Sequence, residues 1–454
     1  MIVFRRAHRL HPGSNSRNRP RWVPGRQEPS PRQQRLPFLE RSLVLERFFK
    51  QSIAGFTLLA VFTAVVASPV GRYNAQRFFL QARSTLVRAV GLPADRWAID
   101  TDWRVRRSYG IERTRRTYQQ AYAQVTPQTR RLLDYAGLSP QDAVLRWGNY
   151  NQTFVLPSRV FAPDDDGRSY RMRPHTRSIW LKDVALSWDV IGFFLVPDTA
   201  ELRSLLEGTG AYAVQGSTQT TNSWGCRGPE PDLSAPLRGL ILGDSNMQGL
   251  LVSDDETPPE CLRRELESRL NTRVSMLNTG HLGYSPEQFF HALLEYGDRF
   301  RPQFVVFSFC ANDFGSVFKP NPNSFDLEEG KFWVGKIFEY CRARGIAVIA
   351  APVPHEEPIT RARREGNYPG KVCDILPIES LWYCNPFDDF ADEQARLDLE
   401  HLRHGAPAKT SPLFNGRLHD NHMSAAGTAL WGKAVGRRLA PLLESERLKG
   451  HIRF

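Results

Sequence analysis

The sequence predicts an α/β protein: a three-layer α/β/α sandwich around a parallel sheet, with a smaller mixed α+β region and a transmembrane helix before it. Two observations lead to this fold class. From about Leu237 onward, short apolar runs alternate with helical segments, and right-handed crossovers between parallel strands place such helices on both faces of a sheet. Nearer the N-terminus, Gln51 to Val70 carry no charged residue, and a run of that length can cross a bilayer.

Composition sets the outer limits. The chain has 454 residues, of which 41% are apolar, enough for a large core and about two domains with appendages. The formal charge is +12, but residues 1–51 hold 12 Lys and Arg against 3 Asp and Glu, which leaves 48 against 45 for the remainder. The body is nearly neutral, so nucleic-acid binding is not expected.

Residues 1–50 are rich in Arg, Pro, Ser and Gln and are predicted to form a disordered basic arm. We interpret 51–71 as one membrane anchor. The excess of Arg and Lys before it predicts a cytoplasmic N-terminus, although arginines also follow the run, and places the rest of the chain outside the cytoplasm. Two alternatives remain open, a buried core helix and a cleaved signal peptide with Val65-Val66-Ala67 as its cleavage site.

Residues 72–220 are predicted to form a mixed α+β region with no recognisable functional residue. Thr126 and Pro127 have the residue types of a helix start, and 178–181 read as a strand. Asp164 to Gly167 superficially match a calcium loop, but a solvated turn explains them better.

Residues 221–447 are predicted to form the second domain, and its elements follow in order. The strands are short apolar runs that end at polar or turn residues, whereas the helices show caps and longer amphipathic patterns. The expected strands are Arg238–Leu242, Val274–Leu277, Phe304–Phe309 and Ile346–Ala351, and the expected helices are Pro258–Leu270, Ser285–Phe300, Trp333–Arg344 and Ser424 to about Leu443.

The six cysteines show no C-x-x-C spacing, so no zinc site is expected. Most are predicted to be buried thiols. Cys373 and Cys384 bracket a loop-like stretch and could pair in an oxidising compartment. No metal and no organic cofactor is predicted.

Polar residues stand where the predicted strands end. Gly243-Asp244-Ser245 follows the first strand, a loop containing Gly283 follows the second, and Asn312 follows the third, while His422 with nearby Asp420 precedes the last helix. In open parallel sheets, the loops at the carboxyl ends of the strands converge on one crevice. A serine, a glycine N–H, an asparagine amide and a histidine with a carboxylate are the groups that acyl transfer requires.

These blocks resemble the SGNH (GDSL-type) hydrolase superfamily, and in particular its membrane-anchored bacterial members. The resemblance implies a flavodoxin-like α/β/α fold, Ser245 as nucleophile, His422 as base and Asp420 as the carboxylate that orients it. It also implies an oxyanion hole formed by the Ser245 N–H, Gly283 and Asn312. Residues 222–230 are similar to the Asn-Ser-x-Gly-x-Arg-x-x-Glu lead-in of some bacterial members.

One departure concerns the acid. The family commonly has two residues between Asp and His, whereas one residue separates Asp420 from His422. Of the competing histidines, His281 lies beside the oxyanion glycine and is a candidate substrate contact, and His419 is expected to be solvated.

The expected function is a serine esterase that removes O-acyl groups, such as acetyl, from an extracytoplasmic glycan or a small ester through an acyl-serine intermediate. The same residues would serve an O-acetyltransferase of cell-surface polysaccharide. A non-catalytic glycan-binding protein with a vestigial site is the third possibility, and the sequence leaves the oligomeric state open.

Overall fold

The protein is described by a computed structural model. It describes residues 68–89, 96–148, 153–164, 169–184, 193–315, 324–355, 368–373, 375–376, 382–404, 411–416 and 421–451. By internal packing the chain divides into two units, Met1–Gly71 and Arg72–Phe454. All contacts considered below lie within the second unit.

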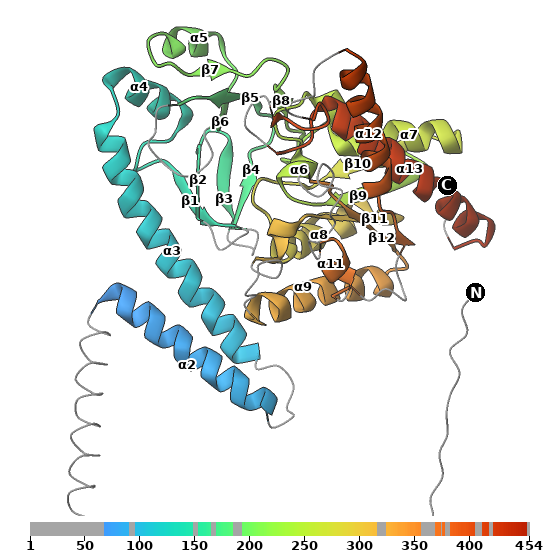
Figure 1. Cartoon of the computed structure of the whole chain (residues 1–454), viewed down its shortest axis with the longest axis horizontal. Helices are drawn as coiled ribbons and strands as arrows, with labels where there is room; N and C mark the ends of the chain where they lie inside the picture. The colour runs from blue at the N-terminus through green and yellow to red at the C-terminus, as the bar shows by residue number, and fades with distance from the viewer. Residues whose placement is uncertain are drawn as a thin grey trace, which may run out of the picture. The chain divides into compact units, whose positions relative to one another are not determined.

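A parallel sheet forms the centre of the second unit (Figure 1). In the described residues its order is β10-β9-β11-β12-β13, with every neighbouring pair parallel. Numbered along the chain this is 2-1-3-4-5, the flavodoxin-like order. The strands are β9 (Leu237–Leu242), β10 (Val274–Asn278), β11 (Phe304–Phe309), β12 (Ala347–Pro352) and β13 (Trp382–Tyr383).

Helices cover both faces of this sheet. On one face, α8 (Pro286–Phe300) and α9 (Ser324–Ala343) pack together. On the other face, α7 (Pro258–Leu270) packs on α13 (Ala425–Leu448), which α12 (Phe387–Arg403) also contacts. The short elements are α6 (Ser245–Gln248), η2 (Asp254–Glu256), η3 (Ala311–Phe314) and α11 (Gly370–Cys373).

The alternation of side chains along each strand separates two cores. In β9, Leu240 and Leu242 enter the core beneath α8 and α9, whereas Ile241 enters the core beneath α7 and α13. Successive side chains of a strand point to opposite faces, and all three are fully buried. This explains why the strands read as continuous apolar runs and not as alternating ones.

The region before the sheet is built from small antiparallel sheets and helices. Strand β5 is central to the largest of these sheets and pairs with β6, β7 and β8, while β1 pairs with β2 and β3 with β4. The strands are β1 (Val144–Trp147), β2 (Thr153–Leu156), β3 (Phe161–Asp164), β4 (Ser169–Met172), β5 (Arg177–Lys182), β6 (Phe193–Pro197), β7 (Tyr212–Ala213) and β8 (Gln219–Thr220), and the helices are α2 (Pro69–Ala89), α3 (Arg96–Gln124), α4 (Pro127–Ala136) and α5 (Ala200–Leu206).

This region shares a core with the parallel sheet. Phe154, Tyr170 and Trp180 belong to the same buried cluster as Leu242 and the α8 side chain Phe289. Helix α3 is joined to the sheet's helices by buried charges, because Arg106 pairs with Asp326 of α9 at 3.0 Å. The Trp103 indole donates to Glu287 of α8 at 3.0 Å.

The predicted elements of the parallel sheet are present. Strand β11 and helix α7 have the predicted ends, and the other predicted strands agree within one residue at each end. Helix α9 begins nine residues before its predicted start, and the two-residue strand β13 and helix α12 were not predicted. The pairing of Cys373 with Cys384, which the sequence left open, is not formed, since Cys384 is a free, buried thiol.

The predicted membrane anchor lies almost wholly outside the described residues, because 51–67 are not among them. Within the part of the chain that the structure describes, no helix has the length and apolar character needed to cross a membrane.

Candidate active site

Ser245 stands where β9 gives way to the short helix α6. Asp244 caps this helix, since its Oδ1 accepts a hydrogen bond from the Asn246 N–H at 2.9 Å. The turn needs glycine at 243, where an added Cβ would lie 2.7 Å from Cβ of Met247. As the first residue of α6, Ser245 has a backbone N–H without an intrahelical acceptor. The corner therefore presents both its hydroxyl and its N–H.

His422 lies against the Ser245 hydroxyl. Its Nε2 is 2.7 Å from Ser245 Oγ, a distance at which the hydroxyl donates to a neutral imidazole. The histidine precedes α13, and its backbone carbonyl accepts from the Asn415 N–H at 2.9 Å. Ser424 caps α13 by accepting from the Gly427 N–H at 3.3 Å. The pair is thus assembled from segments 177 residues apart.

Asp244 joins the loops that follow β9 and β11. Its Oδ2 lies 3.0 Å from the Cys310 sulfur, 3.4 Å from Asn312 Nδ2 and 3.3 Å from Ser245 Oγ. Asn312 also accepts from the Cys310 thiol. The side chain of Asn312 is thereby held beside the corner that presents Ser245, although this predicted oxyanion donor faces the Asp244 carboxylate.

Cys310 acts as a donor in this network. Burial, followed by the charges of Asp244 and Asp313, raises its pKa well above the usual range, so the thiol stays protonated. Its backbone N–H donates to Asp313 Oδ2 at 2.7 Å. Asp244, Cys310 and Asp313 form the only group of three potential metal ligands found in the described ranges, and these hydrogen bonds account for their proximity.

The loop that carries Gly283 is fastened to α6. Asn278 Nδ2 donates to the Met247 carbonyl at 2.8 Å, and the Leu282 N–H donates to Gln248 Oε1 at 2.6 Å. Gly283 itself has φ +71°, a conformation that favours glycine. On the side where a side chain would project, Gly283 faces the preceding region, because an added Cβ would overlap the Phe154 ring and lie 2.9 Å from Tyr170 Oη.

His281, the predicted substrate contact, is 1% exposed. Its Nδ1 lies 3.2 Å from the Thr279 carbonyl, and its Nε2 accepts from the Met172 N–H at 3.3 Å. The ring also stacks on Tyr284. Nε2 therefore joins the loop to strand β4, whereas Nδ1 is used within the loop itself.

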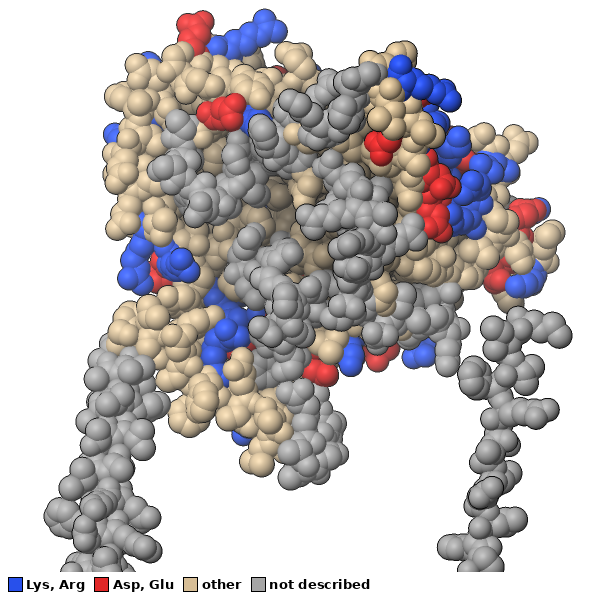
Figure 2. All heavy atoms as spheres, viewed as in Figure 1, with Lys and Arg blue, Asp and Glu red and all other residues tan. Residues whose placement is uncertain are grey.

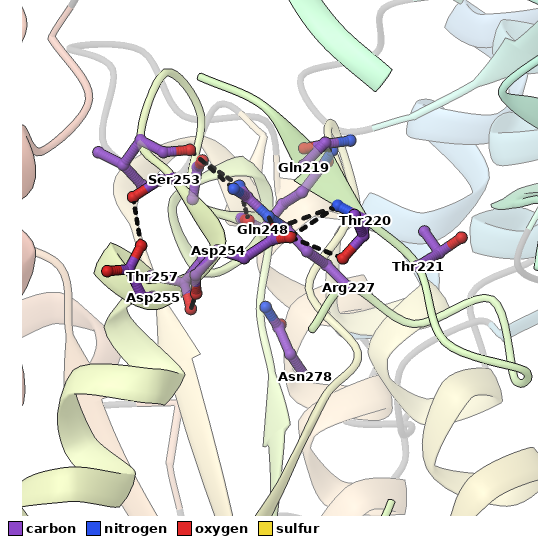
Figure 3. A network of polar contacts seen from close by, with 12 residues as sticks. Gln219, Thr220, Thr221, Arg227, Gln248, Ser253, Asp254, Asp255, Thr257 and Asn278 are labelled. Carbon is purple, nitrogen blue, oxygen red and sulfur yellow. Dashed lines mark hydrogen bonds and ion pairs between the residues drawn. The ribbon is translucent and has the colours of Figure 1, made fainter. Parts of the chain in front are cut away.

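Arg227 supports the far end of α6 from below (Figure 3). Its guanidinium donates to the carbonyls of Gln248, Gly249 and Val252. Its Nε donates to Asp254 at 2.8 Å, and Asp254 in turn accepts from Thr220. The fully buried Arg227 side chain therefore fixes the backbone that follows Ser245 and α6. This contact explains why an arginine stands in the lead-in segment 222–230.

Within the same lead-in, Asn222 and Glu230 shape a turn. Asn222 Oδ1 accepts from the N–H groups of Trp224 and Cys226 at 2.9 and 3.1 Å. Glu230 accepts from the Ser223 N–H and hydroxyl. The turn directs Arg227 beneath α6.

His355 is a site residue that the sequence did not single out. It follows β12, and its ring packs edge-on against Tyr368 at 5.5 Å. Asp244 and His422 are the two titratable groups whose charges influence its imidazole. Burial lowers its pKa to about 4, and its buried Nε2 has no hydrogen-bond partner among the described residues. The sequence offered one signal for His355, its position four residues after the predicted strand Ile346–Ala351.

Asp420 and His419 lie outside the described residues, so the structure does not place the carboxylate expected to orient His422. In the described part, Ser245, His422 and Asn312 are brought together through direct contacts or through Asp244. Gly283 is placed in the adjoining loop.

Comparisons with known proteins give structural neighbours alone, since no family model and no curated protein matches the chain. It is similar to a lipase/acylhydrolase from Enterococcus faecalis, with 18% identity over 45% of this chain and 96% of the other and a TM-score of 0.32.

Two other similar structures are an acetyl xylan esterase and a GDSL-like lipase from Bacteroides thetaiotaomicron. The first has 13% identity over 44% of this chain and 97% of the other, with a TM-score of 0.33. The second has 14% identity over 46% and 88%, with a TM-score of 0.28.

Proposed function

We propose that this protein is an SGNH-type serine esterase that cleaves O-acyl groups through an acyl-serine intermediate. The observation that carries the proposal is the 2.7 Å contact between Ser245 Oγ and His422 Nε2. It lies beyond the carboxyl end of β9, next to the end of β11, which is the place where parallel sheets of this order bind ligands. An imidazole nitrogen at this distance can remove the hydroxyl proton, which is what a serine needs to act as a nucleophile.

In the proposed reaction, His422 Nε2 takes the proton of Ser245 as Oγ attacks the ester carbonyl carbon. The tetrahedral intermediate collapses, the C–O bond to the alcohol breaks, and the imidazolium returns its proton to the leaving alcohol. Water then attacks the acyl-serine with His422 again as base, and this step releases the carboxylic acid and restores the serine.

The negative charge on the former carbonyl oxygen requires donors. The Ser245 N–H at the start of α6 is one, and we assign Gly283 N–H and Asn312 Nδ2 as the others, by their positions in the loops after β10 and β11. Each donor of this type typically contributes ~3 kcal/mol to transition-state stabilisation. Asn312 Nδ2 would exchange its 3.4 Å contact with Asp244 for the developing oxyanion.

The acid partner in this proposal is Asp420, which would accept from His422 Nδ1 and fix the tautomer. We also assign His355 to the substrate. Its Nε2, which has no hydrogen-bond partner among the described residues, belongs to a neutral imidazole, so in the Nε2–H tautomer it can donate to an ester oxygen without adding charge.

The proposed substrate class is a small O-acyl group, such as acetyl, on an extracytoplasmic glycan or on a simple ester. Turnover of p-nitrophenyl acetate by the full chain tests the activity. We expect turnover by the wild type and at least a 10³-fold loss in Ser245→Ala, and mass spectrometry of quenched wild-type enzyme should show an added acyl group that the variant lacks. If the wild type shows neither turnover nor an acyl adduct, the esterase proposal is wrong and the non-catalytic glycan-binding alternative is favoured. A product that forms only with an added sugar acceptor would identify the transferase.

The proposed location is an anchor at 51–71 with the N-terminus in the cytoplasm and residues 72–454 outside. The uncharged run and the basic arm before it support this topology. Protease added to intact spheroplasts should then digest the body and leave the first forty residues protected. Complete protection of the body would reverse the topology.

A further inference from the structure

Helix α2 presents an apolar face that no other described part of the chain covers. Phe78, Phe79 and Leu86 are 68%, 59% and 66% exposed. With Ala75 and Ala82 they recur at intervals of three and four residues, so all five side chains lie on one face of the helix. Several large apolar side chains exposed together on one helix face mark an interaction site.

The opposite face of α2 is fixed on α3 (Figure 1). The ring of Tyr73 stacks on Tyr109 with centroids 4.3 Å apart. Arg77 pairs with the fully buried Asp102 at 2.8 Å, and Leu80 is buried in a small cluster with α3. These contacts settle the rotation of α2, so its apolar face is turned away from the body and cannot be buried by rolling the helix.

The charge around the face is positive. Arg72 and Arg83, both exposed, lie at the border of this face by helix spacing, and the sequence of α2 contains no acidic residue. The Arg83 guanidinium stacks 4.7 Å from the ring centroid of Trp97, which is itself 59% exposed at the start of α3. In Figure 2 the surface around α2 and the start of α3 is mainly tan with blue beside it.

Aromatic side chains on one face, arginines at its border and an exposed tryptophan are the pattern of a helix that lies in a membrane interface. If two copies of this chain paired through α2, the arginines of the two helices would repel one another, because α2 has no acidic residue. Anionic lipid headgroups instead complement the positive charge. The uncharged run Gln51–Val70 immediately precedes α2 in the sequence. If this run is the proposed membrane anchor, α2 follows it directly and starts at the bilayer surface.

We propose that α2 docks on an anionic membrane surface, with Phe78, Phe79 and Leu86 inserted at the boundary between headgroups and acyl chains and Trp97 beside them. Helix α3 is tied to the parallel sheet through Arg106 and Asp326. The docked helix would therefore hold the whole second unit at a set orientation to the bilayer. This proposal is independent of the esterase chemistry.

The test places a nitroxide on the full chain by Phe79→Cys labelling and reconstitutes it in vesicles of phosphatidylcholine with 30% phosphatidylglycerol. Gln81→Cys is the matched control, because position 81 is exposed on α2 about 160° from position 79 around the helix. The unsubstituted chain reports any labelling of native cysteines, and matching far-UV circular dichroism shows that both variants fold.

We expect the label at 79 to gain accessibility to oxygen and to lose accessibility to a water-soluble nickel chelate, by several-fold relative to the label at 81. The difference should shrink in pure phosphatidylcholine. Equal, water-like accessibilities on chains that float with the vesicles would overturn the proposal, and so would a chain that fails to float. Dipolar broadening between labels at 79 would assign the face to a second copy instead.

Discussion

Gln248 Oε1 accepts the Leu282 N–H at 2.6 Å, which joins the last residue of the nucleophile helix to the loop that carries Gly283. The same side chain is fully buried, and its Nε2 lies 3.4 Å from Gln219 Oε1. The Gln248 amide, together with the bond from Asn278 to the Met247 carbonyl, therefore sets the distance between two of the proposed oxyanion donors.

Replacing Gln248 with Leu should lower kcat on p-nitrophenyl acetate by about 10- to 100-fold, because small displacements of catalytic groups have effects of that size. The buried Leu282 N–H loses its acceptor, at a cost of about 1–3 kcal/mol in the free energy of unfolding. Gln219→Leu is the control, since it removes the 3.4 Å contact with Gln248 and a weak contact with Met172 but leaves the acceptor of the Leu282 N–H in place. An equal loss of kcat in both variants would contradict the positioning role.

Asn312→Ala should reduce kcat by ~10² to 10³, because one oxyanion donor is lost. Asn312 is only partly buried, and its side chain gives up one 3.4 Å contact with Asp244 and one hydrogen bond from the Cys310 thiol, so the urea midpoint should fall only slightly. Steady-state kinetics and urea unfolding on the same preparation check both statements, and an unchanged kcat would remove Asn312 from the mechanism.

Asp420→Asn should lower kcat by up to ~10⁴, because an amide can hold the imidazole in the wrong tautomer. The neighbouring His419→Gln, on the same loop, is the control and should retain kcat within about twofold. If Asp420→Asn is as active as His419→Gln, the enzyme is better described as a Ser245–His422 dyad.

His355→Phe should raise KM for the ester several-fold and leave the pH dependence of kcat/KM in place. Its pKa is lowered to about 4 by burial, so above pH 5 the variant removes a neutral group and no charge. A pH–rate profile that moves with this substitution would mean that His355 titrates in the mechanism, contrary to the proposal.

Glu287, at the start of α8, should make the protein less stable as pH rises from about 4.5 to about 7. Burial raises its pKa from 4.5 to about 7, more than Arg107 lowers it. The folded state therefore prefers the protonated form, and this stabilisation, present below pH 4.5, is lost as pH passes through 7.

Glu287→Gln keeps an acceptor for Trp103 and cannot ionise. Between pH 5 and 7.5, urea unfolding should show the free energy of unfolding falling by on the order of 2 kcal/mol more in the wild type than in the variant. If the free energy of unfolding has the same pH dependence in the wild type and in Glu287→Gln, the pKa of Glu287 is not raised in the folded protein.

The parallel sheet could be predicted because its strands are buried on both faces and read as short apolar runs. The shortest strand, β13, was beyond prediction, since its two residues pair through the backbone with Ile349 and Ala350 and carry no periodicity. Helix α3 was hidden for a different reason. It has 29 residues and almost no amphipathic pattern, because its contacts change from α2 to α9 to β1 along its length.

The residues of the nucleophile corner and His422 could be predicted because they follow strands or precede a helix. Gln248, Arg227 and His355 show what such reasoning leaves out. Gln248 and Arg227 act on backbone groups of segments that are distant in sequence, and His355 differs from an ordinary loop histidine in its burial alone. Burial and long-range backbone contacts have no local signature in a sequence.

The cover that Phe154 and Tyr170 place over Gly283 has a consequence for the ancestry of this chain. Tyr170 donates to the Leu282 carbonyl, and Tyr284 donates back to the Tyr170 carbonyl, so the two segments are reciprocally matched. A relative in which an unrelated domain replaces residues 72–220 would keep Ser245 and His422 but would lack Phe154 and Tyr170 over Gly283. In living relatives, positions 154 and 170 should therefore covary with 283 and 284, as two halves of a single inherited unit.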